Sequence, residues 1–324
     1  MLAGMTGLVP GVPRTSQVRS LGEADVDAVV DLITLCEIAE TGEVDVELVD
    51  WITGSATQSH MHGYGIDDEH GLVAFGYIEC IEGHTGLEAE LRVRPGADLD
   101  LGLPILAALR AAAARFDASK PVQMFANRDA HGYRRWLEAQ GAREIRHFWR
   151  MAIDFGDAAP AVPFAPADVV VRRARDDETD LRTIFTVVDS AFVEHFGHTD
   201  ERTFERWIQM WRSRHGFDLT LWWVAEVDAE PIAALLGMTF TDADGVSTGH
   251  VATLGTLKEH RGRGIGAHLL HTAFREFHDR GMRKVTLGVD SENTTGAVRL
   301  YEAVGMHAVT DWPLYELPPI AIAE

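Results

Sequence analysis

Residues 254–270 read LGTLKEHRGRGIGAHLL, and they place a glycine-rich turn between a predicted strand and a predicted amphipathic helix. Three glycines at alternate positions let the backbone turn tightly and bring its amide groups close to a ligand. The start of the helix adds partial positive charge, and two arginines add full charges. The turn predicts a pyrophosphate cradle, the alternative being an ordinary strand-to-helix turn with surface arginines. The cradle residues are Arg261, Gly262, Arg263, Gly264, Ile265, Gly266 and Ala267.

Two other phosphate-binding patterns fit this turn less well. A Walker A loop is excluded, because no Gly-Lys-Ser/Thr follows the glycines. A Rossmann dinucleotide site would place its glycines after the first strand of a βαβ unit, and several elements precede this turn.

The charge around the turn differs from that of the whole chain. The chain carries 29 Lys and Arg against 50 Asp and Glu, a net charge of −21, which favours solubility and argues against a duplex DNA partner. Residues 251–300 carry eight Lys and Arg against five acidic residues. A local basic region on an acidic protein predicts a small anionic ligand.

Length and composition limit the class of protein. A chain of 324 residues predicts two domains of roughly 150 residues each. No apolar run approaches the roughly 20 residues that span a bilayer, so no membrane partner is expected. Residues 1–14 lack the pattern of a signal peptide, which predicts a cytoplasmic protein. Cys36 and Cys80 are too few for a disulfide framework or a four-cysteine zinc site, and no metal is expected.

The chain divides at GDAAPAVPFAPAD, residues 156–168, which read as an extended proline and alanine linker. The predicted domains are therefore 1–155 and 169–324. They show an internal repeat, because residues 133–145 align with residues 297–309. The matched pairs are Arg135 with Arg299, Glu138 with Glu302, Ala139 with Ala303, and Gly141 with Gly305.

Hydrophobic periodicity predicts an α/β (α+β) fold in each half. In the second half, strands are expected at 169–174, 221–227, 231–240, 249–257, 284–289 and within 306–317, and helices at 178–195, 201–213, 264–280 and 295–304. In the first half, helices are expected at 23–36, 101–116 and 130–140, and strands at 60–65, 71–79, 86–93, 121–125 and 143–155.

The cradle stretch, followed by VTLGVDSENTTGAVRLYEAVGM at 285–306, resembles the GNAT superfamily of N-acetyltransferases. The superfamily's R/Q-x-x-G-x-G/A signature is met by Arg261, Gly264 and Gly266. The superfamily's second hallmark is an asparagine followed by a small residue and then a tyrosine in the last helix. Asn293, Ala297 and Tyr301 match it. The resemblance is strong over 169–310 and rests on element order in the first half. It implies two tandem GNAT-like domains, each a mixed, mostly antiparallel sheet flanked by helices, in a layout similar to mycothiol synthases.

The resemblance implies acetyl-CoA, or another acyl-CoA, as co-substrate. Two neighbouring strands splay apart in this family, and the pantetheine pairs with the exposed backbone as an added strand would. The residues expected at that fork are Leu254, Gly255 and Thr256, with Asn293 and Ala297 on the pantetheine side.

The implied reaction is acyl transfer to a primary amine of a small molecule by direct attack on the thioester. Tyr301 is expected to protonate the leaving thiolate, the alternative being a core tyrosine. His250 is the expected base and should share a strand face with Ala252 and Leu254, the alternative being a structural histidine. Mycothiol synthases carry a glutamate at this place. Glu226 and Asp290 are the other candidate bases.

The acceptor pocket is expected under the first two helices of the second half. The candidate residues are Glu194, His195, His198 and Trp211. Helical spacing places Trp207 and Trp211 on one face, where a core role is the alternative. A metal bound by the two histidines would lack a third ligand.

The first half lacks this chemistry. Asp98 and Asp100 stand where the cradle would need arginines, and Leu137 takes the place of the tyrosine. The first half is therefore expected to be a degenerate domain that keeps the fold. Three alternatives stay open for the whole chain: a mycothiol-synthase-like role, transfer to a protein amine, and a non-catalytic acyl-CoA sensor. The acceptor, the acyl length and the oligomeric state are not predicted.

Overall fold

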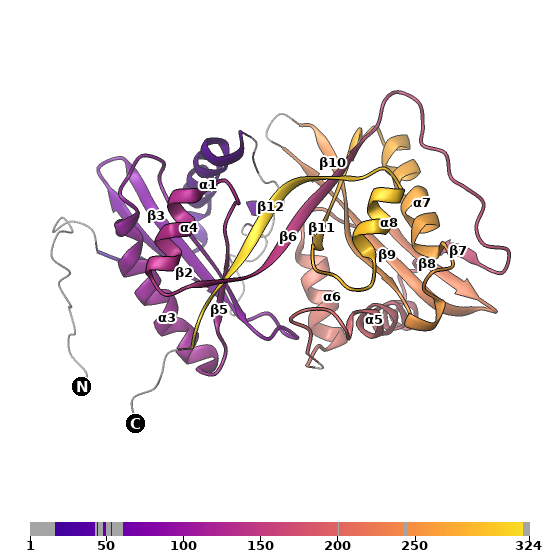
Figure 1. Ribbon diagram of the computed structural model, residues 1–324, viewed down its shortest axis with the longest axis horizontal. Helices are drawn as coiled ribbons and strands as arrows, with labels where there is room; N and C mark the ends of the chain where they lie inside the picture. Colours follow the sequence, from indigo (N-terminus) through magenta and orange to yellow (C-terminus); the bar gives the residue numbers. More distant parts are fainter. Residues whose placement is uncertain are drawn as a thin grey trace.

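The computed structural model describes residues 17–42, 44, 48–49, 53, 61–199, 201–242 and 245–319, and residues 1–14, which suggested the absence of a signal peptide, lie outside these ranges. The described strands form one sheet of twelve (Figure 1). They are β1 (Arg19–Ser20), β2 (Met61–Asp68), β3 (Gly71–Glu79), β4 (Leu87–Val93), β5 (Val122–Phe125), β6 (Arg143–Asp154), β7 (Val170–Arg173), β8 (Phe217–Val227), β9 (Glu230–Thr241), β10 (Ser247–Thr256), β11 (Lys284–Asp290) and β12 (His307–Leu317).

Helices pack on this sheet close to where periodicity predicts them. The α-helices are α1 (Val26–Thr41), α3 (Leu103–Asp117), α4 (His131–Ala139), α5 (Glu178–Phe192), α6 (Phe204–Ser213), α7 (Ile265–Asp279) and α8 (Ala297–Ala303). Local signals set several of their ends. Asp177 caps α5 by accepting a hydrogen bond from the backbone N–H of Asp180 at 2.9 Å. Gly281, with φ of +90°, follows the end of α7.

The strand order shows that the two halves share one topology. The order is β1-β2-β3-β4-β5-β12-β6-β11-β10-β9-β8-β7. Each strand of the first half has a counterpart six strands later along the chain, such as β1 with β7. The two members of each such pair lie at equal distances from the middle of the sheet. Among the described strands, only β4–β5 and β10–β11 pair in parallel. The predicted fold class, two tandem α/β units with mixed and mostly antiparallel sheets, is confirmed.

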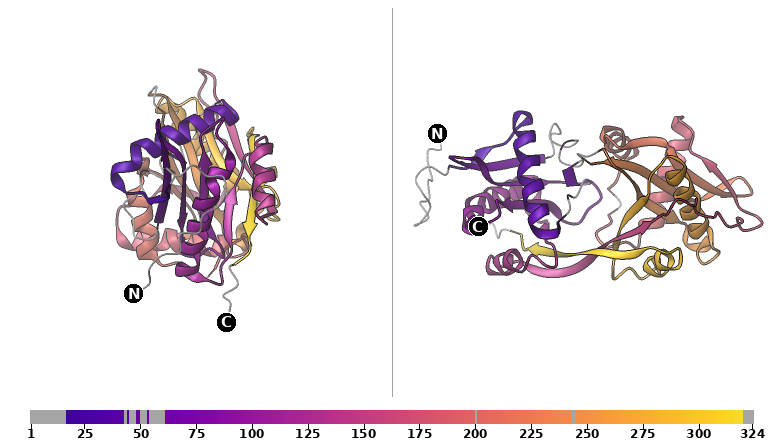
Figure 2. Two further views of the ribbon diagram at one scale, coloured as in Figure 1. Left: turned by 90° about the vertical axis from the view of Figure 1, so that its left-hand side faces the viewer. Right: turned by 90° about the horizontal axis from the view of Figure 1, so that it is seen from above.

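The two halves exchange their last strands. β6, from the first half of the chain, pairs with β11, and β12, from the second half, pairs with β5. The exchanged strands also pair with each other, from His307 opposite Ala152 to Glu316 opposite Arg143. Figure 2 shows β6 and β12 running between the two halves. The segment 306–317, expected to hold several strands, is the single strand β12. The division of the chain into domains at residues 155 and 169 stays a prediction.

Each half buries two apolar clusters, one on each face of its part of the sheet. In the second half, α7 and α8 cover one cluster, which contains Leu269, Phe277 and Tyr301. α5 and α6 cover the other, in which Trp207, Trp211 and Trp222 lie in mutual contact. These tryptophans anchor the helices that carry the loop at 193–199.

Both halves contain a fork between their parallel strands. β10 pairs with β11 only at Gly249–Val285 and His250–Thr286, and a register shift between Val251 and Thr253 follows on β10. In the first half, β4 pairs with β5 over Leu87–Ala89 and then leaves it. A bulge adds one residue to a strand and reverses the alternation of its side chains beyond that point.

The linker segment 156–168 contains no helix or strand and is tied to the start of α7. Asp168 pairs with Arg263, and the carbonyl of Pro163 lies 2.9 Å from Nδ1 of His268. Within the described ranges, no helix is long and apolar enough to cross a membrane. The cytoplasmic location stays a prediction.

Candidate active site

The glycine-rich turn forms an open approach to the start of α7. Gly262 and Gly264 have φ of +75° and +81°, a region that favours glycine. Gly264 is the N-cap of α7 and supplies no side chain to the first amides of that helix, which have no partner within the helix. A Cβ added at Gly264 would meet nothing within 4 Å, whereas one at Gly266 would lie 3.0 Å from Leu300 on α8. The turn therefore leaves room for phosphate oxygens, and Gly266 allows close helix packing.

The two arginines of the turn are held by protein groups. Arg261 donates to the carbonyls of Thr256 and Ala191 at 3.1 and 3.0 Å and pairs with Glu194 at 3.1 Å. Arg263 pairs with Asp168 and contacts His260. Arg261 thus joins the end of β10 to the end of α5.

The fork residues lie beside the turn. The side chain of Leu254 packs with the α7–α8 cluster, while a Cβ at Gly255 would lie 2.9 Å from Ala191 and 3.4 Å from the ring of Phe192 on α5. Asn293 accepts a hydrogen bond from the backbone N–H of Thr295 at 2.8 Å, and Ala297 is the first residue of α8. The roles of these residues toward pantetheine stay predictions.

Tyr301 lies in the cluster between α7 and α8 and is 8% exposed. Burial raises the pKa of its phenol to about 12, so the hydroxyl keeps its proton at neutral pH. A protonated phenol suits the donor role that its motif position predicts.

His250 lies on the other face of β10 and is buried. Its Nδ1 is 2.9 Å from the hydroxyl of Thr286, and its ring packs on Phe240. The expectation that His250, Ala252 and Leu254 share a face is wrong for Leu254. The bulge at 251–253 turns Leu254 toward α7, whereas Ala252 packs with the α5–α6 cluster. Simple alternation along the sequence cannot show such a bulge.

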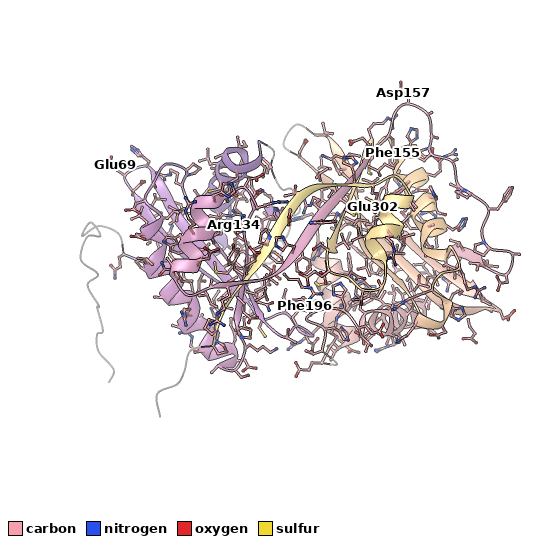
Figure 3. All side chains as sticks on the ribbon, viewed as in Figure 1. Glu69, Arg134, Phe155, Asp157, Phe196 and Glu302 are labelled. Carbon is pink, nitrogen blue, oxygen red and sulfur yellow. The ribbon has the colours of Figure 1, made fainter. Side chains whose placement is uncertain are left out.

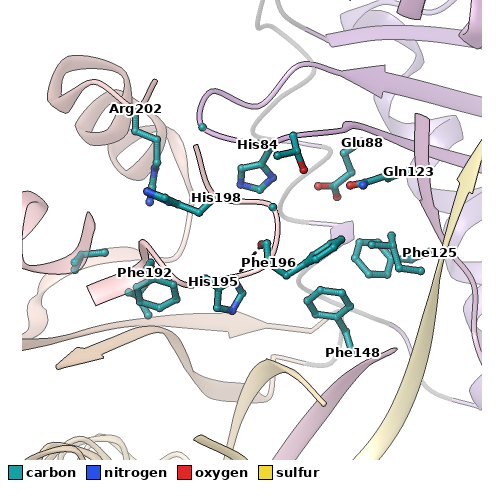
Figure 4. A pocket seen from close by; sticks show the side chains of 16 residues that line it. His84, Glu88, Gln123, Phe125, Phe148, Phe192, His195, Phe196, His198 and Arg202 are labelled. Atoms are coloured by element: carbon teal, nitrogen blue, oxygen red, sulfur yellow. Dashed lines mark hydrogen bonds between the residues drawn. The ribbon is translucent and has the colours of Figure 1, made fainter. Parts of the chain in front are cut away.

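A cavity of about 290 Å³ opens between the two halves at the fork (Figure 4). Both halves line it, and its apolar rings include Phe125, Phe148 and Phe196. Its lining residues are Gly83, His84, Thr85, Glu88, Gln123, Phe125, Phe148, Val188, Phe192, His195, Phe196, Gly197, His198, Arg202, Thr253 and Leu314. Its volume lies near the lower end of the range of small-molecule sites, and its lining combines apolar and polar groups.

Backbone pairing between the halves closes one side of this interlobe pocket. The N–H of Thr85 donates to the carbonyl of Gly197 at 3.0 Å, and the N–H of Thr199 donates to the carbonyl of Gly83 at 2.9 Å. Glu82 accepts hydrogen bonds from the backbone and hydroxyl of Thr203 at 3.1 and 3.0 Å. The first half is therefore part of the site, although no motif within residues 82–88 indicates it.

The four predicted acceptor residues separate into two groups. His195 and His198 line the pocket. Glu194 instead pairs with Lys258 at 2.5 Å and with Arg261, and Trp211 is 4% exposed inside the tryptophan cluster. The other candidate bases also have partners: Glu226 pairs with Arg172 at 2.7 Å, and buried Asp290 pairs with Arg146 at 2.8 Å.

Burial favours the neutral form of two pocket histidines, His84 and His195. It lowers the pKa of His84 to about 4, with Arg202 as the next contribution, and it also lowers the pKa of His195. Arg202 is a weakly paired cation, 3.7 Å from Asp189. Within the described residues, no group of three or more histidine, cysteine or acidic side chains is arranged to hold a metal ion.

The corresponding turn of the first half is occupied by its own side chains. Asp98 accepts a hydrogen bond from the N–H of Asp100 at 3.0 Å, and Asp100 accepts one from the indole of Trp136 at 3.1 Å. At the fork, Arg92 is buried against three glutamates, which are Glu37, Glu40 and Glu90, at 2.9, 3.1 and 2.6 Å. In the first half, acidic side chains thus occupy the turn that corresponds to the glycine-rich turn of the second half, and a buried ion cluster lies on the strand of the corresponding fork.

Comparisons with known proteins decide the family. A model of the Acetyltransferase (GNAT) family matches residues 181–306. A mycothiol acetyltransferase of Thermobispora bispora is 31% identical over 247 residues, a match that covers 72% of this chain and 76% of that protein. The chain belongs to the GNAT acetyltransferase family. It is an N-acetyltransferase of a family that uses acetyl-CoA as co-substrate.

Solved structures show the same tandem GNAT architecture. A GCN5-related N-acetyltransferase from Sphaerobacter thermophilus superposes with a TM-score of 0.76 at 27% identity, covering 95% of this chain and 96% of that one. A tandem GNAT protein from the clavulanic acid biosynthesis pathway superposes with a TM-score of 0.70 at 16% identity, covering 95% of this chain and 100% of that one. The predicted tandem GNAT fold is confirmed by both.

Proposed function

We propose that this GNAT enzyme transfers an acetyl group from acetyl-CoA to a primary amine of a small molecule bound in the interlobe pocket. The observation that carries the proposal is the position of Thr253. This residue belongs to the bulge of β10 at the fork and also lines the pocket. An acyl group that enters along the fork would meet an acceptor held by both halves.

The proposed reaction is direct attack of the neutral amine on the thioester. The nitrogen lone pair forms a C–N bond at the carbonyl carbon, and the C–S bond breaks. The amine loses a proton to a base, and the leaving thiolate takes a proton from the Tyr301 hydroxyl. A backbone N–H near Leu254 would donate to the developing oxyanion. The amides at 262–267 would hold the pyrophosphate.

The test is a panel of primary amines incubated with acetyl-CoA, with release of free thiol as the readout. Acetylation of at least one small amine, with an acetylated product seen by mass spectrometry, supports the proposal. Binding of acetyl-CoA without turnover on any amine would favour the sensor alternative. Acetylation confined to protein amines would favour the alternative of a protein N-acetyltransferase.

A second candidate is a mycothiol-acetyltransferase activity, because relatives of that name match most of this chain. The amine precursor of mycothiol therefore belongs in the panel. The glutamate that mycothiol synthases carry at the position of His250 is missing here, so we expect other amines to compete with that precursor. A preference for the precursor of more than a hundredfold in kcat/KM would establish this second candidate instead.

One CoA is expected to bind per chain. In the first half, Asp98 and Asp100 repel a pyrophosphate and occupy the turn, and β4 carries the buried Arg92 cluster beyond its last pairing with β5. Calorimetric titration with CoA checks the stoichiometry. A value of two would show that the first half binds the cofactor in spite of these side chains.

Glu88→Gln is expected to raise the KM for the amine about tenfold and to leave acetyl-CoA affinity unchanged. Among the described lining residues, Glu88 carries the single carboxylate, and a cationic acceptor favours such a group. Steady-state kinetics with the best amine of the panel checks this. Glu69→Gln is the matched control, because Glu69 lies at the outer end of the first half (Figure 3). An equal KM in both variants would remove Glu88 from acceptor binding.

A further inference from the structure

The proposed reaction needs a base that reaches the acceptor nitrogen, and His250 does not lie among the groups that line the interlobe pocket. It is 3% exposed, its Nδ1 contacts Thr286, and its ring packs on Phe240. A different side chain therefore has to receive the proton.

His195 lies where the fork and the pocket meet. Its ring packs on Phe192, with ring centres 5.2 Å apart, and Phe192 is the residue that a Cβ at Gly255 would touch at 3.4 Å. A continuous line of contact thus runs from the fork through Phe192 to His195. Figure 4 shows His195 and Phe192 on one side of the pocket, opposite Glu88 and Gln123.

One nitrogen of His195 is engaged, which sets the chemistry of the other. Nδ1 lies 3.2 Å from the backbone carbonyl of Phe196, an acceptor, so Nδ1 carries the hydrogen in the neutral ring. Nε2 then presents a lone pair. Burial lowers the pKa of His195 below 6.5, and this keeps the ring neutral at pH 7.

Several charged and titratable groups act on His195, and their effects oppose one another. Asp290 favours the protonated ring, whereas Arg146 and His198 disfavour it. The other titratable groups of the pocket wall are His84, Glu88 and Arg202. Arg146 is held by Asp290 and lies over the Phe196 ring at 4.5 Å, so it steadies the backbone that bonds to His195.

We infer that His195 is the general base, and that its Nε2 takes a proton from the acceptor ammonium in the interlobe pocket. This inference rests on the proposed amine acetylation. The ammonium loses one proton to Nε2, which passes it to water, and becomes a neutral amine that attacks the thioester carbonyl. As the C–S bond breaks, the nitrogen loses its second proton to Nε2 and the leaving thiolate takes the proton of Tyr301. The imidazolium proton then returns through water to the Tyr301 phenolate, so that one proton is released to solvent in each turnover. No other co-reactant is required.

The decisive experiment measures kcat/KM for the best amine from pH 5 to pH 9 in the parent and in His195→Asn. An asparagine amide can still donate to the Phe196 carbonyl but cannot accept the proton. The parent should lose activity tenfold per pH unit below the pKa of the ring and level off near pH 7. His195→Asn should be about a hundredfold less active at pH 7 and recover toward pH 9, where more of the amine is free.

His271→Asn is the matched control. His271 is a histidine of α7 that packs on Phe274 with a ring distance of 6.1 Å, and burial lowers its pKa as well. His271→Asn should keep the pH profile of kcat/KM that the parent shows. Acetyl-CoA affinity and melting temperature confirm that each variant is folded, and His195→Gln provides a second substitution if His195→Asn does not fold.

The possible outcomes separate the two claims. A loss in His195→Asn that is equal at every pH, or activity within threefold of the parent, overturns the assignment of His195. Loss of the acid limb in His250→Gln with retention in His195→Asn returns the role to His250. If the parent acetylates no amine at any pH, the proposed function itself fails, and the assignment of His195 fails with it.

Discussion

Tyr301→Phe is expected to lower kcat by roughly 10²–10⁴-fold, while acetyl-CoA affinity and melting temperature stay near those of the parent. Phenylalanine keeps the ring between α7 and α8 and removes the one proton that the side chain can donate. With a pKa of about 12 the parent phenol is fully protonated at neutral pH, so every active site holds a donor for the leaving thiolate. Release of free thiol reports the affected step directly.

Tyr133→Phe is the matched control for this experiment. Tyr133 lies on α4, the counterpart of α8 in the first half, and burial raises its pKa well above the ordinary value as well. Its loss should leave kcat unchanged. A purely structural Tyr301 would behave differently, costing about 1–3 kcal/mol of stability for a lost buried hydroxyl while turnover stays near normal. Turnover of Tyr301→Phe within threefold of the parent would end the general-acid role.

Gly264→Asp is expected to weaken acetyl-CoA binding about a hundredfold, with a smaller loss of stability. The φ of +81° costs a residue with a side chain about 1–2 kcal/mol. The carboxylate would also stand in the space that the turn leaves open at the start of α7, where it repels a pyrophosphate. A hundredfold change corresponds to about 2.8 kcal/mol. Calorimetric titration with CoA measures it.

Gly141→Asp separates the two contributions. Gly141 follows α4 with a φ of +87°, and a Cβ there would also meet nothing within 4 Å, so the backbone strain is matched. This variant should lose similar stability and keep its CoA affinity. Equal affinities in Gly264→Asp and the parent would show that the turn is not the pyrophosphate cradle.

Most elements could be predicted because their signals are local. The apolar face of α7, the aspartate that caps α5 and the glycine that follows α7 all lie within a few residues of the elements they define. The exchange of β6 and β12 could not be predicted, because the alternation of a strand shows which face is buried and not which partner it takes.

The candidate site divides in the same way. The cradle is one contiguous turn, so its residues are adjacent in the sequence. The interlobe pocket joins residues 83–88, 123–125 and 188–202, which only the fold brings together. The face of Leu254 relative to His250 could not be predicted, because the bulge at 251–253 reverses the alternation between them. The sequence could not place Trp211 in a core or in a pocket, because an aromatic helix face looks alike in both.

The strand exchange also bears on how a duplicated gene can change. After a simple duplication, a copy that loses catalysis is normally free to be deleted. Here β6 of the first copy completes the sheet of the second, and β12 of the second completes the sheet of the first. Deleting either copy would leave the remaining copy without the strand that pairs with its β5 or β11. The first copy is therefore retained by architecture whether or not it binds a cofactor, and its surface is free to acquire new acceptor contacts.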